Sequence, residues 1–189
     1  MTERAKPLAG LRVLDLTRLL PGPVATQHLA DLGADVVKIE DTGEGDYARR
    51  MGARAGETSA LFRLINRNKR SLRLDLKTTD GVAVFRRLSS SADVVIEGFR
   101  PGVMDRLGLG YAALSADNPR LVMCSISGYG QTGPHAQEAG HDINYIARAG
   151  VLDQIGAEGG PPVVPNFQVG DLLGGALTPL VGLLAAVIG

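Results

Sequence analysis

The chain has 189 residues, of which 44% are hydrophobic and 21% are charged, and its formal net charge is zero. This composition is typical of one folded domain with a sizeable core, and it excludes wholesale disorder. The balanced charge argues against a nucleic-acid partner, because general nucleic-acid binders carry a basic excess.

The first part of the chain alternates between strand and helix patterns. Residues 11–16 form an apolar run typical of a strand, residues 21–33 carry helical spacing behind Pro21, and residues 35–40 predict a second strand. Two strands joined through a helix predict parallel pairing. Residues 42–60 are rich in glycine and charge and predict a surface loop with a short helix.

The middle of the chain continues the alternation. Residues 72–76, 94–99 and 121–126 predict three more strands, and Asp80 is expected to cap a helix that runs through Leu88. Strands that alternate with helices predict an α/β fold with a parallel sheet covered on both faces. No cluster of metal-ligand residues is present in the sequence, so we expect no metal site.

The end of the chain is uncharged from residue 172 to residue 189. This run is at the lower limit for a membrane span and contains Pro179 and several glycines, which favours a buried helix and no membrane partner. An apolar helix at this place needs a surface to cover it. We therefore expect either a missing C-terminal part or a partner chain.

The location of the protein is predicted from its two simplest features. Residues 1–10 lack the apolar core of a signal peptide. A single cysteine, Cys124, allows no internal disulfide, which favours a reducing, cytoplasmic location. Cys124 lies in an apolar run and is expected to be a small buried side chain rather than a nucleophile.

Basic residues gather where the predicted sheet would bind a ligand. Lys38 and Arg100 lie at the ends of predicted strands, and ligands of open α/β sheets bind beyond the carboxyl ends of the strands. Such a set suits a polyphosphate ligand, although a solvated basic face is the alternative for any single member. The cluster between residues 63 and 77 consists of Arg63, Arg67, Lys69, Arg70, Arg73 and Lys77.

A second candidate site is the segment Gly-His-Asp-Ile-Asn-Tyr at residues 140–145. Asp142 is expected to cap a helix that runs to Gly150, which would place His141 at the start of that helix. A neutral imidazole in this position can act as a general base. A loop histidine taken alone is more often structural; His28 is expected in the core or an interface, and His135 in solvent.

A third candidate is Asp171, which precedes the long apolar run and is flanked by Gly170. The simplest prediction from spacing is a helix N-cap. The functional alternative is a carboxylate at a helix start, where glycines allow a ligand to come close. His141 and Asp171 together favour paired acid-base chemistry.

These motifs, taken in order, resemble the family III CoA-transferase superfamily of the CaiB/BaiF type, and within it the α-methylacyl-CoA racemases. The resemblance runs from about Leu8 to the end of the chain. It rests on the stretches at residues 21–23, 31–38, 68–72, 74–77, 97–103, 107–110 and 127–134.

The resemblance implies a Rossmann-like large domain over residues 1–189 that binds CoA, with the C-terminal part and a small second domain missing. It also implies an acyl-CoA substrate, no cofactor apart from the CoA of that substrate, and a homodimer whose chains interlock at full length. The implied CoA contacts are Lys38, Leu74, Asp75, Leu76, Lys77, Gly98, Phe99, Arg100, Arg106, Gly140, Asp142, Ile143, Asn144 and Tyr145.

Two reactions share this family's scaffold. In racemases the residues that match His141 and Asp171 flank the α-carbon of a 2-methylacyl-CoA, and one removes the proton that the other replaces. In transferases the residue that matches Asp171 attacks the thioester and forms an acyl anhydride, then an enzyme-bound CoA thioester. The intact segment at residues 140–145 favours the racemase. The CoA transferase and an inactive, truncated CoA-binding fragment remain alternatives.

Overall fold

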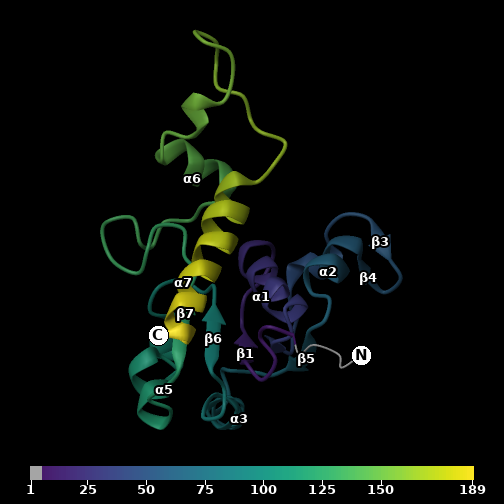
Figure 1. Ribbon diagram of the computed structural model, residues 1–189, viewed down its shortest axis with the longest axis vertical. Coiled ribbons are helices and arrows are strands. Elements are labelled where there is room, and N and C mark those ends of the chain that lie inside the picture. Colours follow the sequence, from purple (N-terminus) through teal and green to yellow (C-terminus); the bar gives the residue numbers. More distant parts are fainter. Residues whose placement is uncertain (1–5) are drawn as a thin grey trace.

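A computed structural model describes residues 6–189 of the chain (Figure 1). Its centre is a parallel five-stranded sheet with the strand order β5-β2-β1-β6-β7. The order reverses beside β1, the first strand, which is where open α/β sheets bind their ligands. The strands are β1 (Arg12–Asp15), β2 (Asp35–Glu40), β5 (Arg70–Arg73), β6 (Val94–Glu97) and β7 (Val122–Ser125).

Helices cover both faces of this sheet. On one face α1 and the C-terminal helix contribute Leu29, Leu180 and Leu183 to a core that also holds Val13 and Val94. On the other face three helices pack against alternate residues of the same strands. The helices are α1 (Pro21–Asp31), α3 (Thr79–Ser89), α4 (Val103–Arg106), α5 (Tyr111–Asp117) and the C-terminal α7 (Thr178–Ile188).

The predicted α/β fold is confirmed, and all five predicted strands are present; the second has the predicted bounds and the other four have shifted ends. The third strand lies at Arg70–Arg73 rather than at residues 72–76. The fourth ends at Glu97 rather than at residue 99, because the Glu97 carboxylate accepts a hydrogen bond from the Phe99 amide and turns the chain there. The N-cap of α3 is Thr78 rather than Asp80, and its hydroxyl accepts from the Gly81 amide.

The segment after β2 contains more structure than the predicted loop with one short helix. It consists of the 3₁₀ helix η1 (Tyr47–Arg50), the two-residue strands β3 (Arg54–Ala55) and β4 (Thr58–Ser59), and the helix α2 (Ala60–Ile65). Figure 1 shows these elements together on one flank of the sheet. Asp46 and Ser59 cap η1 and α2 with their side chains.

The C-terminal helix is continuous from Gly170 to Ile188, and its first part is the wider π-helical segment η3 (Gly170–Leu177). This run is long and apolar enough to cross a membrane by length and composition. One face is buried through Ala176, Leu180 and Leu183, whereas Val181 is 68% exposed. The prediction of a buried helix is therefore correct for one face only.

The single cysteine and the histidines lie largely as the sequence predicts. Cys124 is half-buried against the core. Burial raises the pKa of its thiol, and the negative charge of Glu97 raises it further. A raised pKa disfavours the thiolate, which fits a packing role. His28 is half-buried on α1 and His135 is exposed.

Candidate active site

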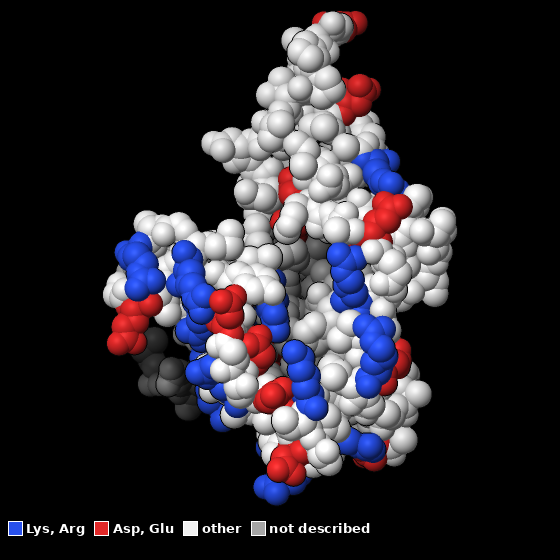
Figure 2. All heavy atoms as spheres, turned by 180° about the vertical axis from the view of Figure 1, so that it is seen from behind, with Lys and Arg blue, Asp and Glu red and all other residues white. Residues whose placement is uncertain are grey.

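A cleft of about 1020 Å³ opens beyond the carboxyl ends of β1, β6 and β7. Its wall is formed by the chain that follows each strand, together with the starts of α6 (Asp142–Arg148) and η3. Figure 2 shows basic side chains on both sides of a hollow near the middle of the molecule. Both predicted catalytic residues, His141 and Asp171, line this cleft.

His141 is the N-cap residue of α6, and its side chain is exposed. Its backbone N–H donates to the Asn144 side-chain oxygen at 2.9 Å, so that Asn144 fixes the first turn. The prediction that Asp142 caps this helix is wrong. Asp142 is the first helical residue, and its carboxylate accepts a hydrogen bond from the Asp171 backbone N–H at 2.9 Å.

Asp171 lies in the first turn of η3, whose N-cap residue is Val169. The prediction of an N-cap role for Asp171 is therefore wrong. A Cβ added at Gly170 would lie only 3.1 Å from the Asp142 carbonyl oxygen. Glycine at this position therefore allows η3 to approach the start of α6.

The electrostatics of Asp171 suit a group that exchanges protons. Burial raises the pKa of its carboxyl above the ordinary value, and the neighbouring Asp142 charge raises it further. The charge that His141 carries when protonated acts in the opposite direction and partly offsets this rise in the pKa of Asp171. A carboxylate with a raised pKa is a stronger base than an exposed aspartate.

Tyr145 holds the segment that carries His141. Its hydroxyl donates to the Gly140 carbonyl oxygen at 2.5 Å, directly before His141. Its ring lies against two glycines, because a Cβ added at Gly128 or Gly140 would come within 2.4 or 2.7 Å of Cε1. Tyr129 packs edge-on against the same ring, with centroids 5.3 Å apart.

The structure places only part of the predicted CoA contacts in the cleft. Those that line it are Gly98, Phe99, Arg100, Gly140, Asn144 and Tyr145. Those that lie elsewhere are Leu74, Asp75, Leu76, Lys77, Arg106, Asp142, Ile143 and Lys38.

Lys38 is the clearest departure among the predicted contacts. The residue is only 1% exposed, and its ammonium group donates to the Thr17 carbonyl oxygen and pairs with Asp46. In this arrangement the Lys38 ammonium group is turned toward protein partners rather than toward the cleft. The sequence places Lys38 near the end of a strand, but it does not show whether the side chain is buried or faces a ligand.

The basic cluster at residues 63–77 is also dispersed. Arg67 and Arg70 pair with Asp31 and Asp35 on the outside of the sheet, and Lys69 pairs with the buried Asp15. These partners come from α1, β2 and β1, more than thirty residues earlier in the chain. The prediction of one polyphosphate site formed by the whole cluster is therefore wrong.

The wall that follows β1, which consists of residues 17–19 and 21–22, was not predicted from the sequence. Arg18 brings a guanidinium group to this wall and pairs with Asp41 at 2.8 Å. The signal that could have found it is its place directly after the first strand of a parallel sheet. Among residues 6–189 there is no group of three or more side chains that could hold a metal ion.

Comparisons with known proteins identify the family to which the chain belongs. Residues 8–189 match the family described as CoA-transferase family III. The chain belongs to this family. A crystal structure of a family member of the CaiB/BaiF type from Brucella suis superposes with a TM-score of 0.91 at 40% identity, over 98% of this chain and 50% of that one.

Curated members of CoA-transferase family III carry both kinds of activity. The human succinyl-CoA:glutarate CoA-transferase is 43% identical over 171 residues, which are 90% of this chain and 39% of that protein. The mouse α-methylacyl-CoA racemase is 43% identical over 180 residues, which are 95% of this chain and 43% of that protein. The chain thus spans about two fifths of the length of these relatives.

Proposed function

We propose that the protein racemises 2-methylacyl-CoA thioesters, with His141 and Asp171 as its two acid-base groups. The observation that carries the proposal is that both side chains line one cleft from separate elements, His141 from the start of α6 and Asp171 from the start of η3. Inversion at the α-carbon needs two such groups, because the proton leaves from one face and returns to the other.

The proposed reaction balances without a cofactor. One group accepts the α-proton, and the electron pair of the broken C–H bond delocalises onto the thioester oxygen. The other group, protonated at the start, returns a proton to the opposite face, and the C=O bond forms again. The raised pKa of Asp171 suits both its basic and its acidic part in this cycle.

The rest of the cleft accommodates the CoA portion of the substrate in this proposal. Gly98 and Phe99 form the wall after β6, and the exposed Arg100 supplies a guanidinium group for a phosphate. Arg100 is held by a hydrogen bond to the Gln137 carbonyl oxygen. CoA is then part of the substrate rather than a separate cofactor.

The test is exchange of the α-hydrogen of a 2-methylacyl-CoA in deuterium oxide. The wild-type protein should incorporate deuterium, and His141→Ala and Asp171→Asn should each lower racemisation by at least about a hundredfold. His135→Ala is the matched control, because His135 is exposed outside the cleft and pairs with Glu138. Absence of exchange in the wild type would rule out the racemase.

A second candidate is a CoA transferase in which Asp171 alone is the nucleophile. It is favoured by the relatives named as CoA-transferases, which match as well as the racemases do. The Asp171 carboxylate would attack the thioester carbon, the C–S bond would break, and CoA thiolate would leave behind an acyl anhydride. CoA transfer from succinyl-CoA to a free carboxylic acid, with only a modest loss in His141→Ala, would support this reaction.

The third candidate is a chain that binds CoA without catalysing either reaction. Binding of CoA in calorimetry, without exchange or transfer, would support it. We also propose that the protein is a cytoplasmic homodimer, in which another surface covers the exposed apolar face of α7. Analytical ultracentrifugation tests the dimer, since a monomer at micromolar concentration would contradict it.

A further inference from the structure

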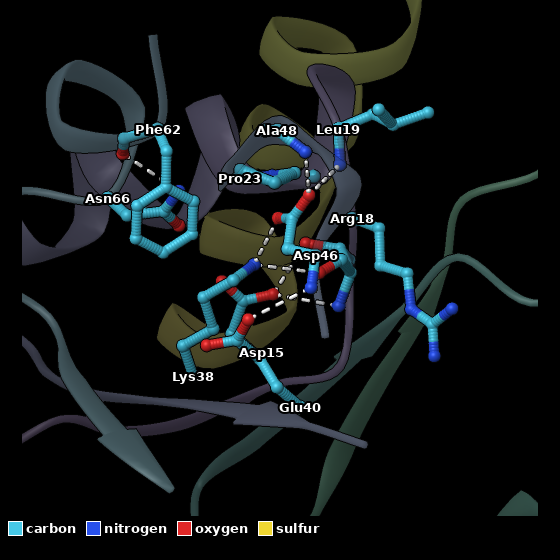
Figure 3. A network of polar contacts seen from close by, with 12 residues as sticks. Asp15, Arg18, Leu19, Pro23, Lys38, Glu40, Asp46, Ala48, Phe62 and Asn66 are labelled. Atoms are coloured by element: carbon cyan, nitrogen blue, oxygen red, sulfur yellow. Dashed lines mark hydrogen bonds and ion pairs between the residues drawn. The ribbon is translucent and has the colours of Figure 1, made fainter. Parts of the chain in front are cut away.

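Six charged side chains form a network beneath the cleft wall that follows β1, and the proposed reaction does not use them. They are Asp15, Lys38, Glu40, Asp46, Arg49 and Lys69, three acids and three bases. Figure 3 shows several of them converging where β1 and β2 end. Asp15 and Lys38 occupy partner positions in the register of these two strands.

The network is buried in its centre and balanced in charge. The side chains of Lys38, Asp46, Lys69 and Asp15 are each at most 2% exposed. Burial alone would raise the pKa of Asp15, yet the ammonium groups of Lys69 and Lys38 hold it well below its ordinary range. Buried charges are costly unless they are paired, and each of these four side chains has an oppositely charged partner, so removal of a single partner would leave an uncompensated buried charge.

The network makes direct contacts with the backbone of the cleft wall. Lys38 Nζ donates to the Thr17 carbonyl oxygen at 2.9 Å, and Asp46 Oδ1 accepts from the Leu19 amide at 3.0 Å. Lys69 Nζ donates to the Pro23 carbonyl oxygen at 2.8 Å. The connection between β1 and α1 is thus tied at three places along seven residues.

The tied segment has a backbone that needs such support. Leu19 has a φ of 62°, in the left-handed region that residues with a Cβ rarely adopt. Thr17 lies close to Gly22, where an added Cβ would come within 2.3 Å of its side chain. Thr17, Leu19 and Gly22 all line the cleft, so a relaxed backbone here would change the shape of the cleft.

We propose that this buried ion network positions residues 17–22 as a wall of the cleft, with the Lys38–Asp46 pair as its central tie. The inference rests on the proposed function in that the cleft binds an acyl-CoA. Lys38 and Asp46 act through the backbone of Thr17 and Leu19, so they are positioning residues and touch no substrate.

Two variants of the Lys38–Asp46 pair distinguish an effect on folding from an effect on the position of residues 17–22. Lys38→Met leaves Asp46 buried without its cation and should destabilise the protein strongly. The double variant Lys38→Met with Asp46→Asn removes both charges and should recover most of that stability, because loss of a whole buried pair is tolerated. The side-chain amide introduced at position 46 keeps an oxygen that can accept from the Leu19 amide. The hydrogen bond from position 38 to the Thr17 carbonyl oxygen is lost in both variants.

Binding of CoA, measured by calorimetry, should remain at least about tenfold weaker in the double variant than in the wild type. The reason is that a small displacement of residues 17–22 changes the shape of the cleft that the ligand contacts. Arg86→Gln is the control, since it breaks only the exposed pair with Asp117 between α3 and α5. A purely structural role predicts that affinity recovers together with stability. Wild-type affinity in the stable double variant would therefore overturn the proposal.

Amide hydrogen exchange tests the inference without any ligand. Exchange of the Thr17, Arg18 and Leu19 amides should be faster in the double variant, while amides of β1 and β6 keep their protection. If the wild type fails to bind CoA, the proposed function is wrong and the exchange data still decide the positioning role. Unchanged protection at residues 17–19 would contradict the positioning role itself.

Discussion

Asp142 and Asp171 are joined by a hydrogen bond of 2.9 Å, in which the Asp142 carboxylate accepts from the Asp171 backbone amide. The bond connects the start of α6 to the start of η3, so it fixes the distance between the elements that carry His141 and Asp171. The same proximity places a negative charge beside the Asp171 carboxyl and raises its pKa. This contact thus fixes the geometry and adds to a rise in the pKa of Asp171 whose largest cause is burial.

Asp142→Asn should shift the pH profile of activity. Asp171 must be ionised to accept a proton, so activity is lost as the pH falls through the pKa of its carboxyl. Loss of the Asp142 charge lowers that pKa, and the acid limb of kcat/KM should move to lower pH. The side-chain oxygen that this variant retains can still accept from the Asp171 amide, and an unmoved limb would show that Asp142 does not tune Asp171. Asp153→Asn, at an exposed position, is the control.

Gly128→Ala should disrupt the cleft, because its Cβ would meet the Tyr145 ring at 2.4 Å. The ring would have to move and would release the Gly140 carbonyl before His141, so kcat should fall by at least about tenfold. Gly182→Ala is the matched control, since nothing lies within 4 Å of its added Cβ on α7. That change should stabilise the helix by about 1 kcal/mol in thermal unfolding and leave kcat unchanged. Equal activity of both variants would contradict the role of the Tyr145 ring.

Asp15→Asn should lower the free energy of unfolding by about 3–5 kcal/mol, because it leaves buried ammonium groups without their anion. Asp35→Asn breaks the exposed pair with Arg70 and should cost at most about 1 kcal/mol. Urea denaturation at neutral pH measures both. A similar loss of unfolding free energy in the two variants would show that the buried network contributes no more to stability than the exposed pair does.

The same residue predicts sensitivity to acid. The pKa of Asp15 is lower in the folded protein than its ordinary value of 3.8, so the folded state binds fewer protons than the unfolded state. Its stabilising contribution is therefore complete above about pH 5 and is lost progressively as the pH falls below about 4. The unfolding free energy of Asp15→Asn should depend less on pH in this range than that of the wild type.

The two faces of α7 should respond differently to truncation. Leu183 is 3% exposed in the core, and Leu183→Ala should cost about 2–5 kcal/mol. Val181 is 68% exposed in the single chain, so Val181→Ala should change the stability of a monomer by no more than about 0.5 kcal/mol and should cost more at protein concentrations at which the proposed dimer forms. A large cost at Val181, measured by thermal unfolding at several protein concentrations, would indicate that a second surface covers this face.

The sequence by itself determined the α/β class, the five strands, and the two residues placed in the cleft. Strand and helix patterns depend on local residue order, and the order and spacing of motifs pointed to the family. Only the tertiary structure decided which basic residues are free to face a ligand. Lys38 and Lys69 look like ligand contacts in the sequence, but the network at the ends of β1 and β2 buries them against Asp46 and Asp15.

The tertiary structure also decided the environment of the Asp171 carboxyl. Asp142 and Asp171 both looked like helix caps, because capping is predicted from the residues next to a helix start. Their actual contact joins residues 29 positions apart and depends on how η3 packs against α6. Sequence patterns describe neighbours along the chain, whereas burial and charge pairing depend on neighbours in space. The raised pKa of Asp171 is therefore a property of the fold.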